Sequence, residues 1–144
     1  MMGNESAMEH NELCLRIATE AHEGQTRRGG EPYINHPIRV ANAFPVDSYR
    51  RSIAYLHDVL EDCPEWTGKR LALEGVFPTV YVAVELLTKK PGQDYDDYLD
   101  DVREINAARE VKIADMLDNL TDSPTDNLTP KQIEKYKKGI LYLV

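Results

Sequence analysis

The sequence has little of what marks secreted or membrane proteins. Its only cysteines, Cys14 and Cys63, lie far apart in no pairing motif, which gives no sign of a zinc-thiolate site and suggests a reducing compartment. No apolar run approaches the roughly 18 residues that span a bilayer, and residues 1–10 lack the basic start and apolar centre of a secretion signal. We therefore expect a cytoplasmic protein without a membrane partner, in which Cys14 packs in the core and Cys63 lies at a helix end.

Positive charge is also scarce. The chain carries 17 Lys and Arg residues against 25 Asp and Glu residues, for a formal net charge of −8. Sequence-independent binding to DNA, RNA or an anionic membrane needs a basic face, so this balance argues against such partners. An anionic small-molecule substrate would have to meet a local positive site.

Length and composition indicate one folded domain over residues 1–144. Hydrophobic residues make up 42% and charged residues 29% of the 144-residue chain, close to the average for folded proteins. A chain of this size has room for one core, and the sequence shows neither an internal repeat nor a low-complexity linker. The sequence leaves the oligomeric state undetermined.

Hydrophobic periodicity predicts an all-α fold of about seven or eight helices. The third begins at Asp47, a plausible N-cap, and ends before Pro64. β-branched residues at 76–84 suit a strand, yet no matching strand exists to pair with it, so this segment is interpreted as a buried helix. Thr129 and Pro130 suit the start of the last helix. The expected helices cover residues 11–23, 38–44, 47–62, 69–75, 80–87, 95–104, 107–120 and 130–143.

The segment Leu56 to Asp62 holds four side chains suited to metal binding or acid–base chemistry: His57, Asp58, Glu61 and Asp62. On a continuous helix His57 lies one turn from Glu61, and Asp58 one turn from Asp62. His57 and Asp58 could then bind a metal, while Glu61 and Asp62 in the next turn reach a water molecule on that metal. The plain alternative is a solvated acidic helix end.

Two further segments add candidate ligands. His36 precedes Pro37 and an apolar helix, a position more typical of a packed or capping histidine. Asp115 would by itself be a surface carboxylate in most proteins. Around it, Lys112, Asp115 and Asn119 share one helix face, and the apolar seam is expected at Ile113, Leu117 and Leu120.

Together these motifs resemble the HD-domain phosphohydrolases, in particular the alarmone hydrolase branch related to RelA and SpoT. The resemblance covers residues 20–122 and rests on Ala21-His22-Glu23-Gly24-Gln25 with Arg27, Tyr33-Ile34-Asn35-His36-Pro37, Leu56-His57-Asp58-Val59-Leu60-Glu61-Asp62, and Val111-Lys112-Ile113-Ala114-Asp115 with Asn119. It implies a single HD-domain helix bundle that hydrolyses guanosine 3′,5′-bis(diphosphate) at its 3′-pyrophosphate. The long relatives also carry a synthetase domain, for which 144 residues leave no room, so synthetase activity is not expected.

The resemblance also implies roles for individual residues. It makes one divalent ion, usually Mn²⁺, the cofactor, with Fe²⁺ or Co²⁺ as alternatives. Two imidazoles and two carboxylates without a thiolate suit such ions. The implied metal ligands are His36, His57, Asp58 and Asp115, the implied water-activating pair is Glu61 and Asp62, and the implied substrate contacts are Arg27, Arg28, Lys112 and Asn119.

Structural alternatives stay open for several of these residues. Asp62 also suits a purely structural role at the end of its helix, and Arg28 suits a solvent-exposed loop position. Arg27 is the implied base-stacking residue, since a guanidinium offers a flat face and several donors. His22 is interpreted as structural.

The chain departs from the family pattern at Met116, Asp118 and Asp122, where the branch commonly has arginine, histidine and threonine. These departures leave the exact nucleotide open. One alternative is a phosphatase acting on a 2′-phosphorylated dinucleotide cofactor or a nucleoside monophosphate. Another is a nucleotide-binding module without turnover. An iron-dependent oxygenase is a remote third alternative, because no ligands for a second metal are evident.

Overall fold

The structure, a computed structural model, describes residues 2–121 and 128–144, and all regular structure within them is helical. Its helices are α1 (Met2–Ala21), α2 (Asn35–Ala41), α3 (Arg50–Leu56), α4 (Val59–Asp62), α5 (Gly68–Leu73), α6 (Pro78–Leu86), α7 (Tyr95–Val102), α8 (Asn106–Thr121) and α10 (Pro130–Leu143). The expected all-α fold is thus confirmed. Within the described residues, the one β-type pairing is an isolated bridge between Thr26 and Pro32.

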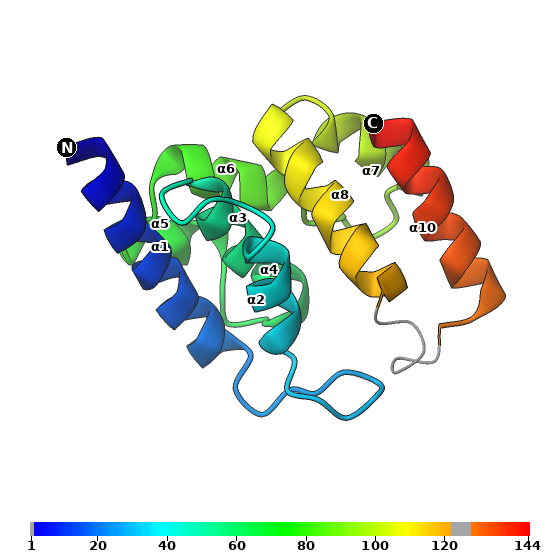
Figure 1. Cartoon of the computed structure of the whole chain (residues 1–144), viewed down its shortest axis with the longest axis horizontal. Helices are drawn as coiled ribbons and strands as arrows, with labels where there is room; N and C mark the ends of the chain where they lie inside the picture. The colour runs from blue at the N-terminus through cyan, green and yellow to red at the C-terminus, as the bar shows by residue number, and fades with distance from the viewer. Residues whose placement is uncertain (1, 122–127) are drawn as a thin grey trace.

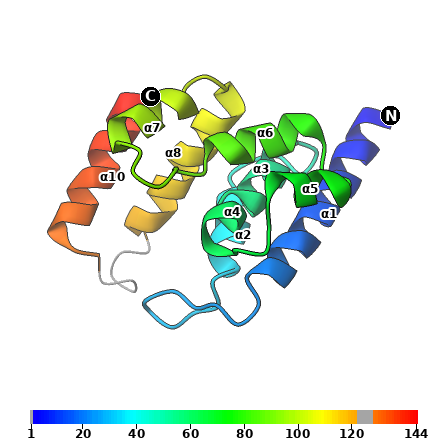
Figure 2. The ribbon, with the colours of Figure 1, turned by 180° about the vertical axis from the view of Figure 1, so that it is seen from behind.

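The helices pack around α3. This short helix contacts α1, α2, α6 and α8, and its residues 52–56 are all buried. Figure 1 shows α1 at one end of the molecule and α8 beside α10 at the other, and the reverse view in Figure 2 shows α6 running between these two parts. The central position of α3 explains why the segment that follows it lies in the interior.

Several local predictions are confirmed. Thr129 caps α10 by a capping box with Gln132, and Pro130 is its first residue. The segment that could have been a strand is the helix α6, and Val80, Ala83 and Val84 on it are buried. Cys14 is a core residue. The buried Cys63 ends α4.

Other predictions are wrong in detail. Asp47 does not cap a helix, because α3 begins only at Arg50. Leu117 is half-exposed instead of part of an apolar seam. The buried side of α8 carries Ala108, Val111, Asp115 and Met116. The core therefore meets α8 along a stripe rotated from the expected one, and this rotation turns Asp115 inward.

The predicted helix over residues 47–62 is broken. α3 ends at Leu56, His57 is its C-cap, and Asp58 is the N-cap of α4. Adjacent side chains on a continuous α-helix point about 100° apart. The junction relaxes that constraint, so the two consecutive side chains can converge on one point. This turn replaces the arrangement expected from a continuous helix, in which His57 would lie one turn from Glu61 and Asp58 one turn from Asp62.

None of the helices within residues 2–121 and 128–144 combines the length and apolar character that a bilayer span needs.

Candidate metal centre

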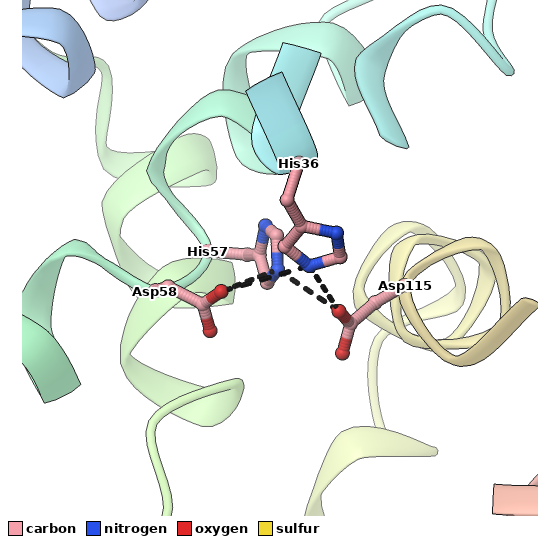
Figure 3. Close-up of side chains that lie close together, drawn as sticks. All are labelled: His36, His57, Asp58 and Asp115. Carbon is pink, nitrogen blue, oxygen red and sulfur yellow. Dashed lines mark hydrogen bonds and ion pairs between the residues drawn. The ribbon is translucent and has the colours of Figure 1, made fainter. Parts of the chain in front are cut away.

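Four predicted ligands converge from three parts of the fold. His36 comes from the first turn of α2, His57 and Asp58 from the α3–α4 junction, and Asp115 from α8 (Figure 3). One ligand atom from each lies within 4.8 Å of every other. Residues up to 79 positions apart in the chain thus form a single cluster.

The donor atoms are spaced as neighbouring ligands of one ion are. The Nε2 atom of His57 lies 3.0 Å from Asp58 Oδ2 and 3.2 Å from Asp115 Oδ1, and His36 Nε2 lies 2.7 Å from the same Asp115 oxygen. Ligands held at about 2.0–2.1 Å from a small divalent cation in octahedral geometry are roughly 3 Å apart. The cluster therefore suits such an ion.

Hydrogen bonds fix the ring nitrogens for this task. The Nδ1 atom of His57 lies 2.6 Å from the carbonyl oxygen of Ala54, which only accepts, so Nδ1 carries the proton. The Nδ1–H of His36 donates to the carboxylate of Asp118 at 2.7 Å. Both rings thereby present Nε2 to the centre, where its lone pair can bind a metal.

The electrostatics of the cluster favour a cation. Burial disfavours charge on His57, but the charges of Asp58 and Asp115 outweigh that effect and raise its pKa well above the usual value. Burial likewise opposes ionisation of Asp115, but Lys112 and His57 hold the pKa of this carboxyl well below its usual range. The carboxylates of this cluster thus stabilise positive charge on their neighbours, and a divalent ion can supply that charge in place of protons.

Asp118, which appeared in the sequence only as a departure from the family pattern, supports the centre from behind. Besides His36, it accepts hydrogen bonds from Arg39 at 2.8 and 3.1 Å, and it lies 3.6 Å from an Arg27 nitrogen. Its position three residues after Asp115 on α8 was the available signal. Carboxylates that hold a ligand histidine fix its tautomer and orientation.

Tyr33 is a second supporting residue that the sequence analysis missed. Its hydroxyl donates to Asp58 Oδ2 at 2.5 Å. Burial and then the charge of Asp58 raise the pKa of Tyr33, which keeps the hydroxyl protonated as a donor. The three-residue spacing between Tyr33 and His36 was the available signal.

A cavity of about 430 Å³ opens beside the cluster. Its size falls in the range of small-molecule sites. It brings together every predicted substrate-contact and water-activating residue. Its walls carry the tyrosines Tyr33, Tyr95, Tyr98 and Tyr136, the cations Arg27, Arg28, Lys89, Lys112 and Lys135, the acids Asp58, Glu61, Asp62 and Asp115, and also Thr26, His36, Asn119 and Leu128.

Glu61 and Asp62 lie on this wall with raised pKa values. Desolvation is the main cause for both, and the charge of Asp58 adds to it. One Glu61 oxygen accepts the backbone N–H of Lys89 at 2.6 Å, which fixes the side chain. A carboxylate with a raised pKa is a better proton acceptor near neutral pH than an ordinary one.

The predicted substrate contacts are held by neighbouring elements. The Arg27 guanidinium, 7% exposed, donates to Asn119 Oδ1 at 2.9 Å. Arg28 donates to Gln132 of α10 at 2.8 Å. Lys112 contacts Asp115 Oδ2 at 3.0 Å. The bonds of Arg27 and Arg28 join the loop before α2 to α8 and α10 around the cavity.

His22 contacts the supporting residue Tyr33. Its Nδ1 atom is 2.8 Å from Gln25 Oε1, and its ring packs on Tyr33 at a centroid distance of 4.8 Å. His22 thus has the structural surroundings expected of it. Asp122, the third departure from the family pattern, falls outside the described residues.

About a third of the chain is similar in sequence to known bacterial proteins. Guanosine-3′,5′-bis(diphosphate) 3′-pyrophosphohydrolase of Vibrio cholerae is 52% identical over 50 residues, 33% of this chain and 7% of that protein. The bifunctional (p)ppGpp synthase/hydrolase SpoT of Escherichia coli is 51% identical over 51 residues, also 33% of this chain and 7% of that protein. The chain is related to the RelA/SpoT-type ppGpp hydrolases.

Longer matches agree with this relationship. The putative chloroplastic GTP diphosphokinase RSH1 of Oryza sativa is 36% identical over 107 residues, 72% of this chain and 11% of the plant protein. A solved structure of a metazoan SpoT orthologue, described as hydrolysing ppGpp, has the same fold, with a TM-score of 0.73 and 24% identity over 93% of this chain and 84% of that one. No family model matches the chain. The matched segments span only a small fraction of the curated relatives.

Proposed function

We propose that the chain is a metal-dependent hydrolase that removes the 3′-pyrophosphate of guanosine 3′,5′-bis(diphosphate). The observation that carries this proposal is the convergence of His36, His57, Asp58 and Asp115 next to a cavity that also holds Glu61 and Asp62. The activities for which the bacterial relatives are named supply the substrate class. The single domain over residues 1–144, the cytoplasmic location and the choice of Mn²⁺ over Fe²⁺ or Co²⁺ stay predictions.

A bound divalent ion supplies charge stabilisation at the phosphoryl oxygens and a lowered pKa for water. The four ligands would hold that ion, and Asp118 and Tyr33 would orient His36 and Asp58. Two imidazoles and two carboxylates suit the borderline and hard ions named above.

The acidic pair Glu61 and Asp62 would carry out the proton transfer. Glu61 or Asp62 would accept a proton from water as the water oxygen bonds to phosphorus and the bond from phosphorus to the ribose 3′ oxygen breaks. The same proton would then pass to the 3′ oxygen, so that pyrophosphate and a free 3′ hydroxyl are released. The products are the nucleoside 5′-diphosphate and pyrophosphate. Arg27 and Asn119, already bonded to each other, would contact the nucleoside, and Arg28 would face its phosphates.

The test is a hydrolysis panel with metal analysis. Purified protein with Mn²⁺ and guanosine tetraphosphate or pentaphosphate is expected to release pyrophosphate, and the chelated protein and His57→Ala are expected to release none. The panel includes a 2′-phosphorylated dinucleotide and nucleoside monophosphates. Release of orthophosphate from those alone would show the alternative phosphatase, and tight nucleotide binding without any product would show a binding module.

A further inference from the structure

Arg39 on α2 joins two parts of the site that serve different purposes. Its guanidinium donates to both carboxylate oxygens of Glu31, at 2.9 and 3.1 Å, in the loop before α2. It also donates to both oxygens of Asp118 on α8, at 2.8 and 3.1 Å. The sequence analysis singled out neither Arg39 nor Glu31. One guanidinium thus bridges two carboxylates that are remote from each other in the sequence.

The Asp118 end of this bridge leads to the metal centre. Asp118 accepts the Nδ1–H of the ligand His36 at 2.7 Å. His36 and Arg39 both belong to α2, and residues three apart on a helix are neighbours. The guanidinium therefore meets the carboxylate that holds the ligand ring. An ion bound at Nε2 of His36 would fix the ring, the carboxylate and the guanidinium together.

The Glu31 end of the bridge leads to Arg27, the proposed contact to the nucleoside. The backbone carbonyl oxygen of Glu31 accepts the N–H of Arg27 at 2.9 Å, and the carboxylate of Glu31 lies 3.9 Å from Arg27 Nε. The bridge between Thr26 and Pro32 closes the same segment into a short hairpin. A bond that holds Glu31 therefore also holds the hairpin that carries Arg27.

A hydrogen-bonded connection between the two ends runs through Arg39. The guanidinium of Arg27 itself lies 3.6 Å from Asp118, which is longer than a hydrogen bond. Arginine suits the bridging position because its planar guanidinium offers five donors in a fixed fork, whereas a lysine ammonium has no such fork. The hydrogen bond from Arg39 is also the main reason that the pKa of Glu31 is lowered, so this carboxylate stays ionised as an acceptor.

We infer that Arg39 is a positioning residue that couples the metal centre to recognition of the nucleoside by Arg27. Order imposed at one end of a connected network lowers the entropy that binding at the other end still costs. A bound divalent ion would therefore tighten nucleoside binding, and a bound nucleoside would tighten metal binding by the same factor. This inference rests on the proposed function and names the residue through which its metal and nucleoside sites act on each other.

The test measures binding without turnover. Guanosine is the probe, because it has no phosphate to be hydrolysed or to bind Mn²⁺. Equilibrium dialysis gives its dissociation constant for the metal-free protein and for the protein at saturating Mn²⁺. In the wild type we expect Mn²⁺ to tighten guanosine binding at least about fivefold, the lower end of typical coupling between two sites. In Arg39→Gln and Arg39→Lys we expect a gain of less than about twofold.

Glu31→Ala cuts the bridge at its other end and separates coupling from metal affinity. Asp118 keeps its bonds to His36 and Arg39 in this variant. Competition with a chelating dye should therefore show Mn²⁺ affinity within about twofold of the wild type, while the effect of Mn²⁺ on guanosine binding is lost. A merely structural role of the bridge would not separate these two measurements.

Arg50→Gln is the matched control. Arg50 donates to Glu110 of α8 at 2.7 and 2.9 Å, and its side chain is 38% exposed against 34% for Arg39. Glu110 lies about two turns before Asp118 on α8. Arg50→Gln therefore removes a similar ion pair and should keep the wild-type coupling.

Three results would overturn the inference: no effect of Mn²⁺ on guanosine binding in the wild type, wild-type coupling in Arg39→Gln, or an equal loss of coupling in Arg50→Gln. Intact coupling in a protein that releases no pyrophosphate would overturn only the proposed function.

Discussion

Replacing Asp118 by alanine should weaken metal binding without touching a metal ligand. Asp118 accepts the Nδ1–H of His36 at 2.7 Å, and His36 is only 2% exposed. The alanine variant leaves that N–H in the interior without its acceptor and releases the ring from its fixed orientation. Arg39 keeps its bonds to Glu31 at 2.9 and 3.1 Å, so the rest of this network persists.

The expected loss of metal affinity in Asp118→Ala is large enough to measure. Removing the partner of a ligand histidine typically costs 10–100-fold in metal affinity, which is roughly 1.4–2.7 kcal/mol. An unpaired buried donor costs about 1–3 kcal/mol, so the two arguments agree. The metal affinity of Asp118→Asn should lie between those of the wild type and Asp118→Ala. The amide oxygen of asparagine can accept the hydrogen bond from His36, but its NH₂ group cannot accept one from Arg39.

The assay is a competition between the protein and a chelating dye for Mn²⁺. Asp97→Ala is the control, since Asp97 is an exposed carboxylate of α7 and the variant changes the net charge equally. An Asp118→Ala protein that binds Mn²⁺ within twofold of wild type would refute the role of the carboxylate in holding His36. If Asp97→Ala lost as much Mn²⁺ affinity as Asp118→Ala, the change in net charge alone would explain the effect.

Three further predictions concern catalysis, pH and packing. Glu61→Gln should retain Mn²⁺ while turnover falls by about 10²–10⁴, and full activity would exclude Glu61 from water activation. Burial lowers the pKa of His10, whose Nε2 accepts the N–H of Phe77 at 2.9 Å. Below about pH 6.5 the unfolded chain binds a proton at His10 that the folded state disfavours, so this residue removes stability as pH falls. The difference in unfolding free energy between wild type and His10→Gln, measured with urea at pH 7.5 and 5.5, should therefore shift against the wild type at the lower pH, and an unchanged difference would contradict this. Gly139→Ala, usually stabilising within a helix, should instead destabilise by about 1–2 kcal/mol, because the new methyl would lie 2.8 Å from Met116 Sδ; a raised melting temperature would contradict it.

Local signals in the sequence accounted for much of the fold. Thr129 and Pro130 marked the start of α10 because capping depends on neighbouring residues alone. The helix at residues 78–86 was predictable because no partner strand existed for it. The break after Leu56 was not predictable, since residues 47–62 read locally as one helix. Packing of the buried α3 against four neighbours accompanies that break.

For the candidate site, the sequence by itself determined which residues could bind a metal, because their chemistry and motif spacing are local properties. Only the tertiary structure decided which atoms meet. It joined Asp118 to His36 across 82 positions, and it brought Lys89 and Lys135 to the cavity of the metal centre. Such contacts depend on how helices pack, and helix packing is set by the whole core and not by any one segment.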